Sequence, residues 1–193
     1  QSDAIFSFGH NPGTNHPRML GTLREVSRRG GNIVAINPLK ERGLERFQDP
    51  QAAVEMMTNG STPISRYYFQ PNVGGDYALM FGMLKHLREW DIQALAAGKK
   101  SVFDRSFIEM NTVGFDAMME EIDRTAWSDI HTHTGLSPEH LESLAKMYLD
   151  AKTAIFCWGM GITQHRHGTA NVHMLANLML ARGHIGRPGA GLA

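Results

Sequence analysis

Two patterns of hydrophobic residues alternate along the chain, short apolar runs and longer helical repeats. The short runs cover residues 4–8, 32–37, 67–70 and 153–158. Short apolar or aromatic runs that end at Gly, Asn or Pro are typical of buried strands. The sequence therefore predicts four strands. A helical segment separates the first two, so these form a strand-helix-strand unit with parallel strands.

Helical repeats fill much of the remaining sequence. A helix is expected from Pro17 to the Gly30–Gly31 pair, because Pro favours the first turn and Gly the end of a helix. Ser137 before Pro138 is a typical helix start. Further helices are expected after residue 76, over 106–123 with a break near Gly114, over 138–151 and over 170–183. Residues 38–66 are expected to be irregular. This alternation predicts an α/β domain with a mostly parallel sheet.

Composition narrows the class of protein. The chain has 193 residues, enough for one domain, and its 19 Lys and Arg balance its 19 Asp and Glu. Nucleic acid is therefore not an expected partner. No apolar run is long enough to span a membrane, and no secretory signal opens the chain. Both ends look cut, so we expect a fragment of a larger protein.

Cys157 is the single cysteine. It excludes an intrachain disulfide and an iron–sulfur cluster held by four cysteines of this chain. It lies inside a predicted strand, so we expect a core thiol. A single buried cysteine suits a reducing compartment, and we expect a cytoplasmic location.

Four polar, Gly-rich loops follow the predicted strands, over residues 9–17, 37–43, 71–76 and 159–168. In parallel sheets, ligands bind beyond the carboxyl ends of the strands. Glycines allow backbone N–H groups to approach a phosphate, and a carboxylate such as Asp76 can accept from the two N–H donors of a guanine edge. One such loop alone is more often only a turn. Four together favour a nucleotide site.

Other ligands fit less well. The NAD fingerprint G-x-G-x-x-G fails at residues 159–164, which read GMGITQ, and no acidic residue lies near position 180. The pairs His131/His133 and His165/His167 suggest a metal site, but the chain has neither H-E-x-x-H nor C-x-x-C. Exposed or hydrogen-bonded histidines are the favoured interpretation. A non-catalytic nucleotide-binding or interaction module remains an alternative.

Four segments in order carry a resemblance. They read FGHNPGTNHP, AINPLKERGLERF, GGDYALMFGMLKHL and AIFCWGMGITQHRHGTANVHMLANLMLARGHIGRPGAG. Their order and spacing resemble those of the molybdopterin oxidoreductases, the large subunits of the formate dehydrogenase and nitrate reductase group. The branch of formate dehydrogenase-like alpha subunits, with its N-P-L-x-E-x-G loop, is the most similar.

The resemblance implies a cofactor and a role for this chain. The family holds two molybdopterin guanine dinucleotides (bis-MGD) around one molybdenum or tungsten. Residues 1–193 would be a single Rossmann-like three-layer domain that binds the guanosine end and pyrophosphate of one dinucleotide. The cofactor-binding residues it implies are Gly9, His10, Asn11, His16, Asn37, Pro38, Leu39, Gly74, Gly75, Asp76, Gly159, Met160, Gly161 and Gln164.

Some parts of the family pattern differ or are absent. Asn37 stands where many members have Asp, so its contact with the base brings no charge. Any [4Fe–4S] cysteines and the metal-ligating residue would lie upstream, and the domain that closes over the second cofactor downstream. Expected partners are therefore the remaining domains of the same polypeptide, a small-molecule substrate and a possible redox partner subunit. No catalytic residue or metal ligand is assigned to this chain, and the isolated fragment is expected to be inactive.

Overall fold

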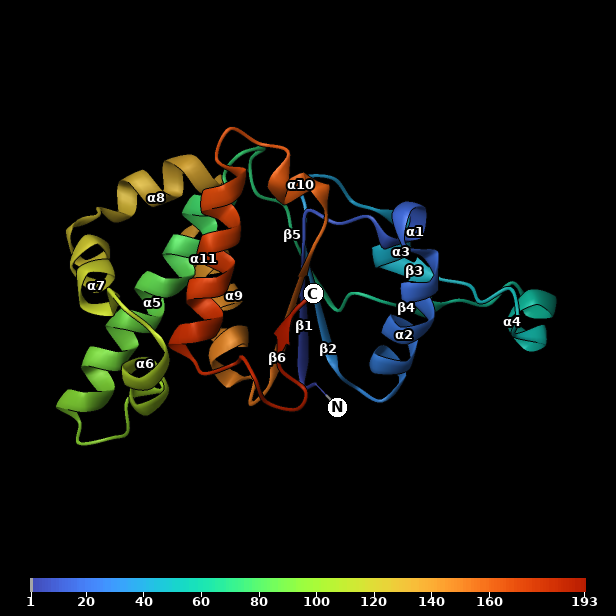
Figure 1. Ribbon diagram of the computed structural model, residues 1–193. Coiled ribbons are helices and arrows are strands. Elements are labelled where there is room, and N and C mark those ends of the chain that lie inside the picture. Colours follow the sequence, from blue (N-terminus) through green and yellow to red (C-terminus); the bar gives the residue numbers. More distant parts are fainter. Residues whose placement is uncertain (1) are drawn as a thin grey trace.

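The computed structural model describes residues 2–193 and contains a five-stranded parallel sheet (Figure 1). The strand order is β5-β2-β1-β6-β7, and every neighbouring pair is parallel. The strands are β1 (Ala4–Phe8), β2 (Asn32–Ile36), β5 (Tyr67–Phe69), β6 (Ala154–Trp158) and β7 (Gly191–Leu192). The predicted α/β class and parallel sheet are confirmed. The predicted strand ends hold to within one residue.

Helices cover both faces of the sheet, which makes three layers. One face is covered by α2 (Pro17–Arg28), and the other by α5 (Asp76–Ala96), α9 (Pro138–Asp150) and α11 (Gly168–Ala181) (Figure 1). Ser137 caps α9 as expected, because its Oγ accepts a hydrogen bond from the backbone N–H of His140 at 3.3 Å. The Rossmann-like three-layer arrangement is therefore confirmed.

The sheet separates two hydrophobic cores. Side chains alternate between the faces of a strand. Phe6 and Phe156 therefore point to the helices α5, α9 and α11, where their rings lie 5.1 Å apart within the larger core. Ile5 and Cys157 belong to the smaller core under α2. Cys157 is buried, and burial raises the pKa of its thiol to about 11, as expected of a core thiol.

Three further helices pack outside the central ones (Figure 1). They are α6 (Arg105–Asn111), α7 (Phe115–Arg124) and α8 (Trp127–Thr134), of which α7 and α8 pack on α5. The expected break at Gly114 is confirmed, since this residue has a φ of +76°. The helix α8 was not predicted.

The segment 38–66 is more regular than the sequence indicates. It contains α3 (Arg42–Glu45), β3 (Arg46–Phe47), α4 (Ala53–Thr58) and β4 (Thr62–Pro63), and β3 pairs with β4 in an antiparallel ladder. The segment carrying α4 projects from the body (Figure 1). The buried Arg24 of α2 holds it through Asp49 at 2.9 Å and Glu55 at 2.6 Å. These ion pairs join residues distant in sequence, so local patterns could not reveal them.

Two short helices lie within the Gly-rich loops, α1 (Pro12–Asn15) after β1 and α10 (Met160–Thr163) after β6. Within residues 2–193, no helix combines the length and apolarity needed to cross a lipid bilayer.

Candidate functional site

The four loops follow the neighbouring strands β5, β2, β1 and β6, and all lie at the carboxyl ends of these strands. The chain runs from β1 to β2 and β5 on one side, and then returns to place β6 and β7 on the other side of β1. The strand order therefore reverses between β1 and β6. In open α/β sheets, ligands bind at such a switch point, outside the carboxyl ends of the strands. The loops after β1 and β6 flank this position.

The loops after β1 and β6 touch each other through their backbones. The N–H of Gly161 donates to the carbonyl oxygen of Gly9 at 3.2 Å, and the N–H of Gly159 donates to that of Phe8 at 3.2 Å. A Cβ on Gly161 would lie 2.6 Å from the oxygen of Gly9. Gly9 itself has a φ of +52°. These glycines are therefore required by the contact between the two loops, whether or not a ligand also approaches them.

His10 and His16 meet in the loop after β1. The Nε2 of His10 lies 2.9 Å from the Nδ1 of His16. His10 is 5% exposed, and its Nδ1 has no hydrogen-bond partner among the described residues. Burial lowers the pKa of His10, and the neighbouring His16 adds to this effect. His16 is exposed and precedes the first residue of α2.

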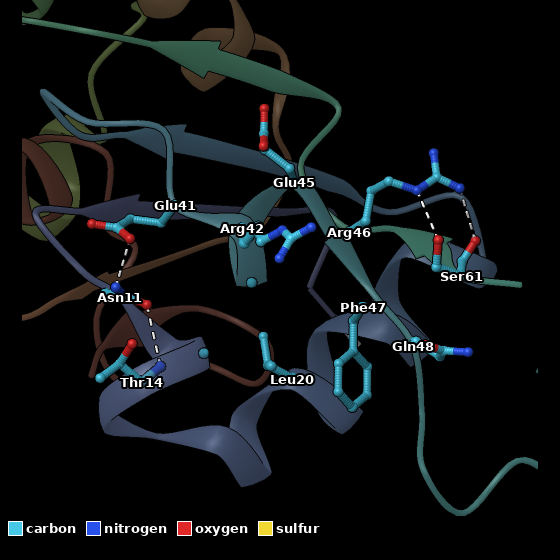
Figure 2. Close-up of a pocket in the computed structure, with 12 residues that line it drawn as sticks. Asn11, Thr14, Leu20, Glu41, Arg42, Glu45, Arg46, Phe47, Gln48 and Ser61 are labelled. Atoms are coloured by element: carbon cyan, nitrogen blue, oxygen red, sulfur yellow. Dashed lines mark hydrogen bonds between the residues drawn. The ribbon is translucent and has the colours of Figure 1, made fainter. Parts of the chain in front are cut away.

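Asn11 joins the loop after β1 to the loop after β2, as Figure 2 shows. Its Oδ1 accepts from the N–H of Thr14 at 3.2 Å, and its Nδ2 donates to Oε2 of Glu41 at 2.6 Å. Each end of the amide makes one hydrogen bond within the protein, so Asn11 is held in place between the two loops.

The loop after β2 is fixed by side chains from β5 and the residue after it. The hydroxyl of Tyr68 donates to the carbonyl oxygen of Leu39 at 2.7 Å and accepts from the N–H of Glu41 at 2.9 Å. Gln70 donates from Nε2 to the carbonyl oxygen of Pro38 at 2.8 Å. The backbone N–H of Asn37 donates to the carbonyl oxygen of Phe69 at 3.0 Å. Leu39 remains 69% exposed, so these hydrogen bonds hold the loop with the Leu39 side chain facing solvent.

Asp76 is the buried acid of the site. It is 3% exposed and opens the 21-residue helix α5. Burial raises the pKa of its carboxyl group, while His165 and its own backbone N–H oppose the shift. None of the side-chain hydrogen bonds among the described residues involves this carboxylate.

The loop before Asp76 rests on the end of α8. The N–H of Asn72 donates to the carbonyl oxygen of Thr134 at 2.9 Å. A Cβ on Gly75 would lie 2.6 Å from the carbonyl oxygen of His133. Gly74 has a φ of +83° and open space around it. The helix α8, which was not predicted, thus supports the site. Position 75 requires glycine because the backbone of α8 lies so close to it.

Met160 and Gln164 lie on the outer side of the loop after β6. Met160 is 62% exposed, and Gln164 donates from Nε2 to its sulfur at 3.4 Å. The buried amide of Asn171 donates to the carbonyl oxygen of Ile162 at 3.0 Å and fixes α10 to α11. Met160 and Gln164 are thus accessible to a molecule at this edge.

A cavity of about 620 Å³, which the sequence did not indicate, lies beside this edge (Figure 2). The Asn11–Glu41 hydrogen bond forms part of its wall. Gly13 and Gly43 also line it, and a Cβ on Gly43 would lie 2.8 Å from the Cα of Gly13. The other lining residues are Thr14, Leu20, Arg42, Glu45, Arg46, Phe47, Gln48 and Ser61.

The two histidine pairs lie in different elements of the chain. Within residues 2–193, no group of three or more His, Cys, Asp or Glu side chains is arranged to hold a metal ion. His131 and His133 lie on α8, and His165 and His167 lie in the loop before α11.

Comparisons with known proteins place the chain in a family. The family described as "Molybdopterin oxidoreductase" matches residues 1–193. Protein YdeP of Escherichia coli is 50% identical over 98% of this chain and 25% of its own length. Formate dehydrogenase H of the same species is 27% identical over 99% of this chain and 23% of its length. The chain therefore spans about a quarter of the length of these relatives.

A solved structure supports the fold. The acetylene hydratase from Pelobacter acetylenicus superposes with a TM-score of 0.75 at 16% identity, over 97% of this chain and 22% of that chain. Because the family match covers the whole chain, the chain belongs to the molybdopterin oxidoreductase family.

Proposed function

We propose that this chain binds the guanosine end and pyrophosphate of one molybdopterin guanine dinucleotide within a larger molybdenum- or tungsten-dependent oxidoreductase. The complete enzyme would hold two dinucleotides, and this domain would bind and orient one of them. The family membership and the four loops at one sheet edge support this role.

Asp76 is the observation that carries the proposal. A buried carboxylate is stable only when hydrogen-bond donors or cations surround it. Asp76 as a residue is 3% exposed, and burial raises the pKa of its carboxyl group, while His165 and its own backbone N–H lower this pKa. A guanine edge supplies two N–H donors side by side, which would satisfy both carboxylate oxygens. The site therefore fits a guanine base on chemical grounds.

The remaining site residues fit an extended ligand. The N-terminus of α2 and the Gly-rich loops after β1 and β6 suit a pyrophosphate, because backbone N–H groups and the helix dipole favour anions. Leu39 and Met160 are large apolar side chains that are 69% and 62% exposed at the same edge. A bound dinucleotide would cover such side chains. Asn37 can hydrogen-bond the base without adding charge.

The formate dehydrogenase-like character is the finer part of the proposal. It rests on the N-P-L-x-E-x-G loop and on 27% identity to formate dehydrogenase H. When bound, the metal–pterin group supplies the electron chemistry, while the protein supplies binding and orientation. The residues of this chain would hold the guanosine and pyrophosphate end of the cofactor. Contacts with the substrate and with any redox partner would therefore be made by the rest of the polypeptide.

Nucleotide selectivity of the full-length apoenzyme tests the proposal. We expect GDP to bind more tightly than ADP or NAD, because a guanine edge offers Asp76 two donors and an adenine edge does not. GMP, which lacks the second phosphate, is expected to bind more weakly than GDP. A preference for NAD would contradict the proposal. Equal affinity for GDP and ADP would show that Asp76 does not recognise the guanine base.

A further inference from the structure

The pair of imidazoles at the end of β1 has an unequal environment. His10 is 5% exposed and lies under the loop after β6, where a Cβ on Gly159 would come within 3.1 Å of the Cα and Cδ2 of His10. His16 is exposed and is the N-cap residue of α2, yet its side chain makes no capping hydrogen bond. Its ring therefore does not cap its own helix and contacts His10 instead.

The two facing ring nitrogens of His10 and His16 must share one proton in a hydrogen bond. The Nε2 of His10 and the Nδ1 of His16 are 2.9 Å apart, which is a hydrogen-bond distance, and one nitrogen must donate while the other accepts. Two arrangements are possible. Either His10 donates from Nε2, or His16 donates from Nδ1.

Burial decides between the two arrangements. If His16 donated, neutral His10 would carry its own proton on Nδ1, which is buried and has no partner among the described residues. A buried N–H without an acceptor loses its hydrogen bonds to water without replacement, which costs about 1–3 kcal/mol. If His10 donates from Nε2, its Nδ1 is a bare nitrogen and no donor is stranded. Desolvation also disfavours a charged His10, since it lowers the pKa of this residue, and His16 acts in the same direction.

We infer that His10 is a positioning residue that fixes the tautomer of His16. By donating to Nδ1 of His16, His10 places the remaining proton of His16 on Nε2. His16 then presents its Nε2–H as a donor at the carboxyl ends of the strands, beside the start of α2. An acceptor atom, such as a phosphate oxygen of the bound dinucleotide, is its partner. The identity of this acceptor rests on the proposed function, whereas the tautomer does not.

The tautomer can be measured directly in the full-length apoenzyme. Long-range ¹H–¹⁵N correlation spectra of ¹⁵N-histidine-labelled protein distinguish a protonated from a bare ring nitrogen, and loss of the signals in His16→Gln assigns them. We expect His16 to carry its proton on Nε2. His10→Gln, whose amide can still donate, should keep this tautomer. His10→Met, which cannot donate, should give a mixture of tautomers.

Binding of GDP supplies the second readout. His10→Met should weaken GDP binding about fivefold, the effect of one misdirected neutral hydrogen bond, while His10→Gln should restore most of the affinity. His173→Gln, at an exposed position on α11, is the matched control and should change neither readout.

Two outcomes separate this inference from the proposed function. A proton on Nδ1 of His16 in the wild type, or an unchanged tautomer in His10→Met, would overturn the positioning role even if GDP binds. A fixed Nε2–H tautomer in a wild type that binds no GDP would instead overturn the proposed function and the phosphate acceptor. The wild-type spectrum decides the tautomer even if a variant fails to fold.

Discussion

The backbone N–H of Gly161 donates to the carbonyl oxygen of Gly9, so the loops after β1 and β6 meet backbone to backbone at the reversal of strand order. A side chain at position 161 would lie 2.6 Å from that oxygen. We expect Gly161→Ala to destabilise the protein by about 1–3 kcal/mol, the usual cost of overpacking, and to lower cofactor content. Thermal unfolding of the full-length enzyme and its bound molybdenum or tungsten are the measurements.

Gly21→Ala is the matched control for this substitution. Gly21 lies within α2, and a Cβ there would meet nothing within 4 Å. Ala is favoured over Gly in a helix interior by about 0.5–1 kcal/mol, so Gly21→Ala should raise the unfolding temperature. Equal behaviour of the two variants would show that the contact between the loops does not constrain position 161.

The local signals in the sequence predicted much of the fold. Pro17 and the Ser137–Pro138 pair marked real helix starts, because capping depends on residues close in sequence. Gly114 marked the break between α6 and α7 for the same reason. Four strands of the five-stranded sheet were also predicted, since each lies in a short apolar or aromatic run.

Features built from distant contacts were not predicted. The helix α8 contains two His and two Thr in its last four residues, a weak helical pattern, and it is held against α5. The strand β7 has two residues, and its pairing with Ile155 and Phe156 defines it. For the site, sequence reasoning selected the loops but could not foresee that Gly9 and Gly161 contact each other, or that Asn11 is engaged by Glu41.

The attachment of α4 should depend on pH through Glu55. The N–H of Asp49 and the guanidinium of Arg24 hold the pKa of Glu55 below its usual 4.5. A lowered folded-state pKa means that the stabilisation is present above about pH 4.5 and is lost as pH falls through the folded value. Hydrogen exchange of residues 48–61, corrected for intrinsic rates, should therefore accelerate in acid.

Glu55→Gln should show this fast exchange at pH 6 already, because it removes the charge that pairs with Arg24. Glu25→Gln is the control, since Glu25 lies 3.9 Å from the same guanidinium but its side chain is 70% exposed. Slow exchange in Glu55→Gln at pH 6 would mean that other contacts hold α4.

His184 should make the fold sensitive to mild acid. It is 1% exposed, its ring lies edge-on to Tyr148 at 5.4 Å, and burial lowers its pKa from 6.5 to about 3. The folded state therefore holds His184 neutral, and its contribution is complete above pH 6.5. It is lost progressively as pH falls from 6.5 toward 3, because the unfolded chain binds the proton first.

His184→Phe should therefore flatten the decline in unfolding temperature between pH 7 and pH 5. His173→Gln, at an exposed position, should leave the decline unchanged. A wild-type slope in His184→Phe would show that other groups cause the acid sensitivity.

Cys157 should resist thiol reagents in the native protein. It is 3% exposed, and its raised pKa leaves little thiolate at neutral pH. Peptide mass spectrometry after treatment with a charged maleimide should find Cys157 unmodified in the native enzyme and modified after unfolding. A cysteine introduced by Lys99→Cys, in the exposed turn after α5, is the positive control. Rapid modification of native Cys157 would contradict its place in the core.

The guanine contact of Asp76 is the central claim, and retention of the cofactor by Asp76→Asn tests it most directly. The measurement is the amount of GMP released from purified full-length enzyme by acid hydrolysis, with Asp116→Asn, in the first turn of α7, as the matched control. Loss of a charged hydrogen bond costs about 1.5–3 kcal/mol, so cofactor affinity should fall about 10- to 150-fold. We predict loss of the GMP of the one dinucleotide that this domain holds in Asp76→Asn, and unchanged GMP in Asp116→Asn. The enzyme is dialysed before the measurement, so that a weakly bound cofactor can dissociate. Full GMP content in a folded Asp76→Asn enzyme after this step would contradict the account.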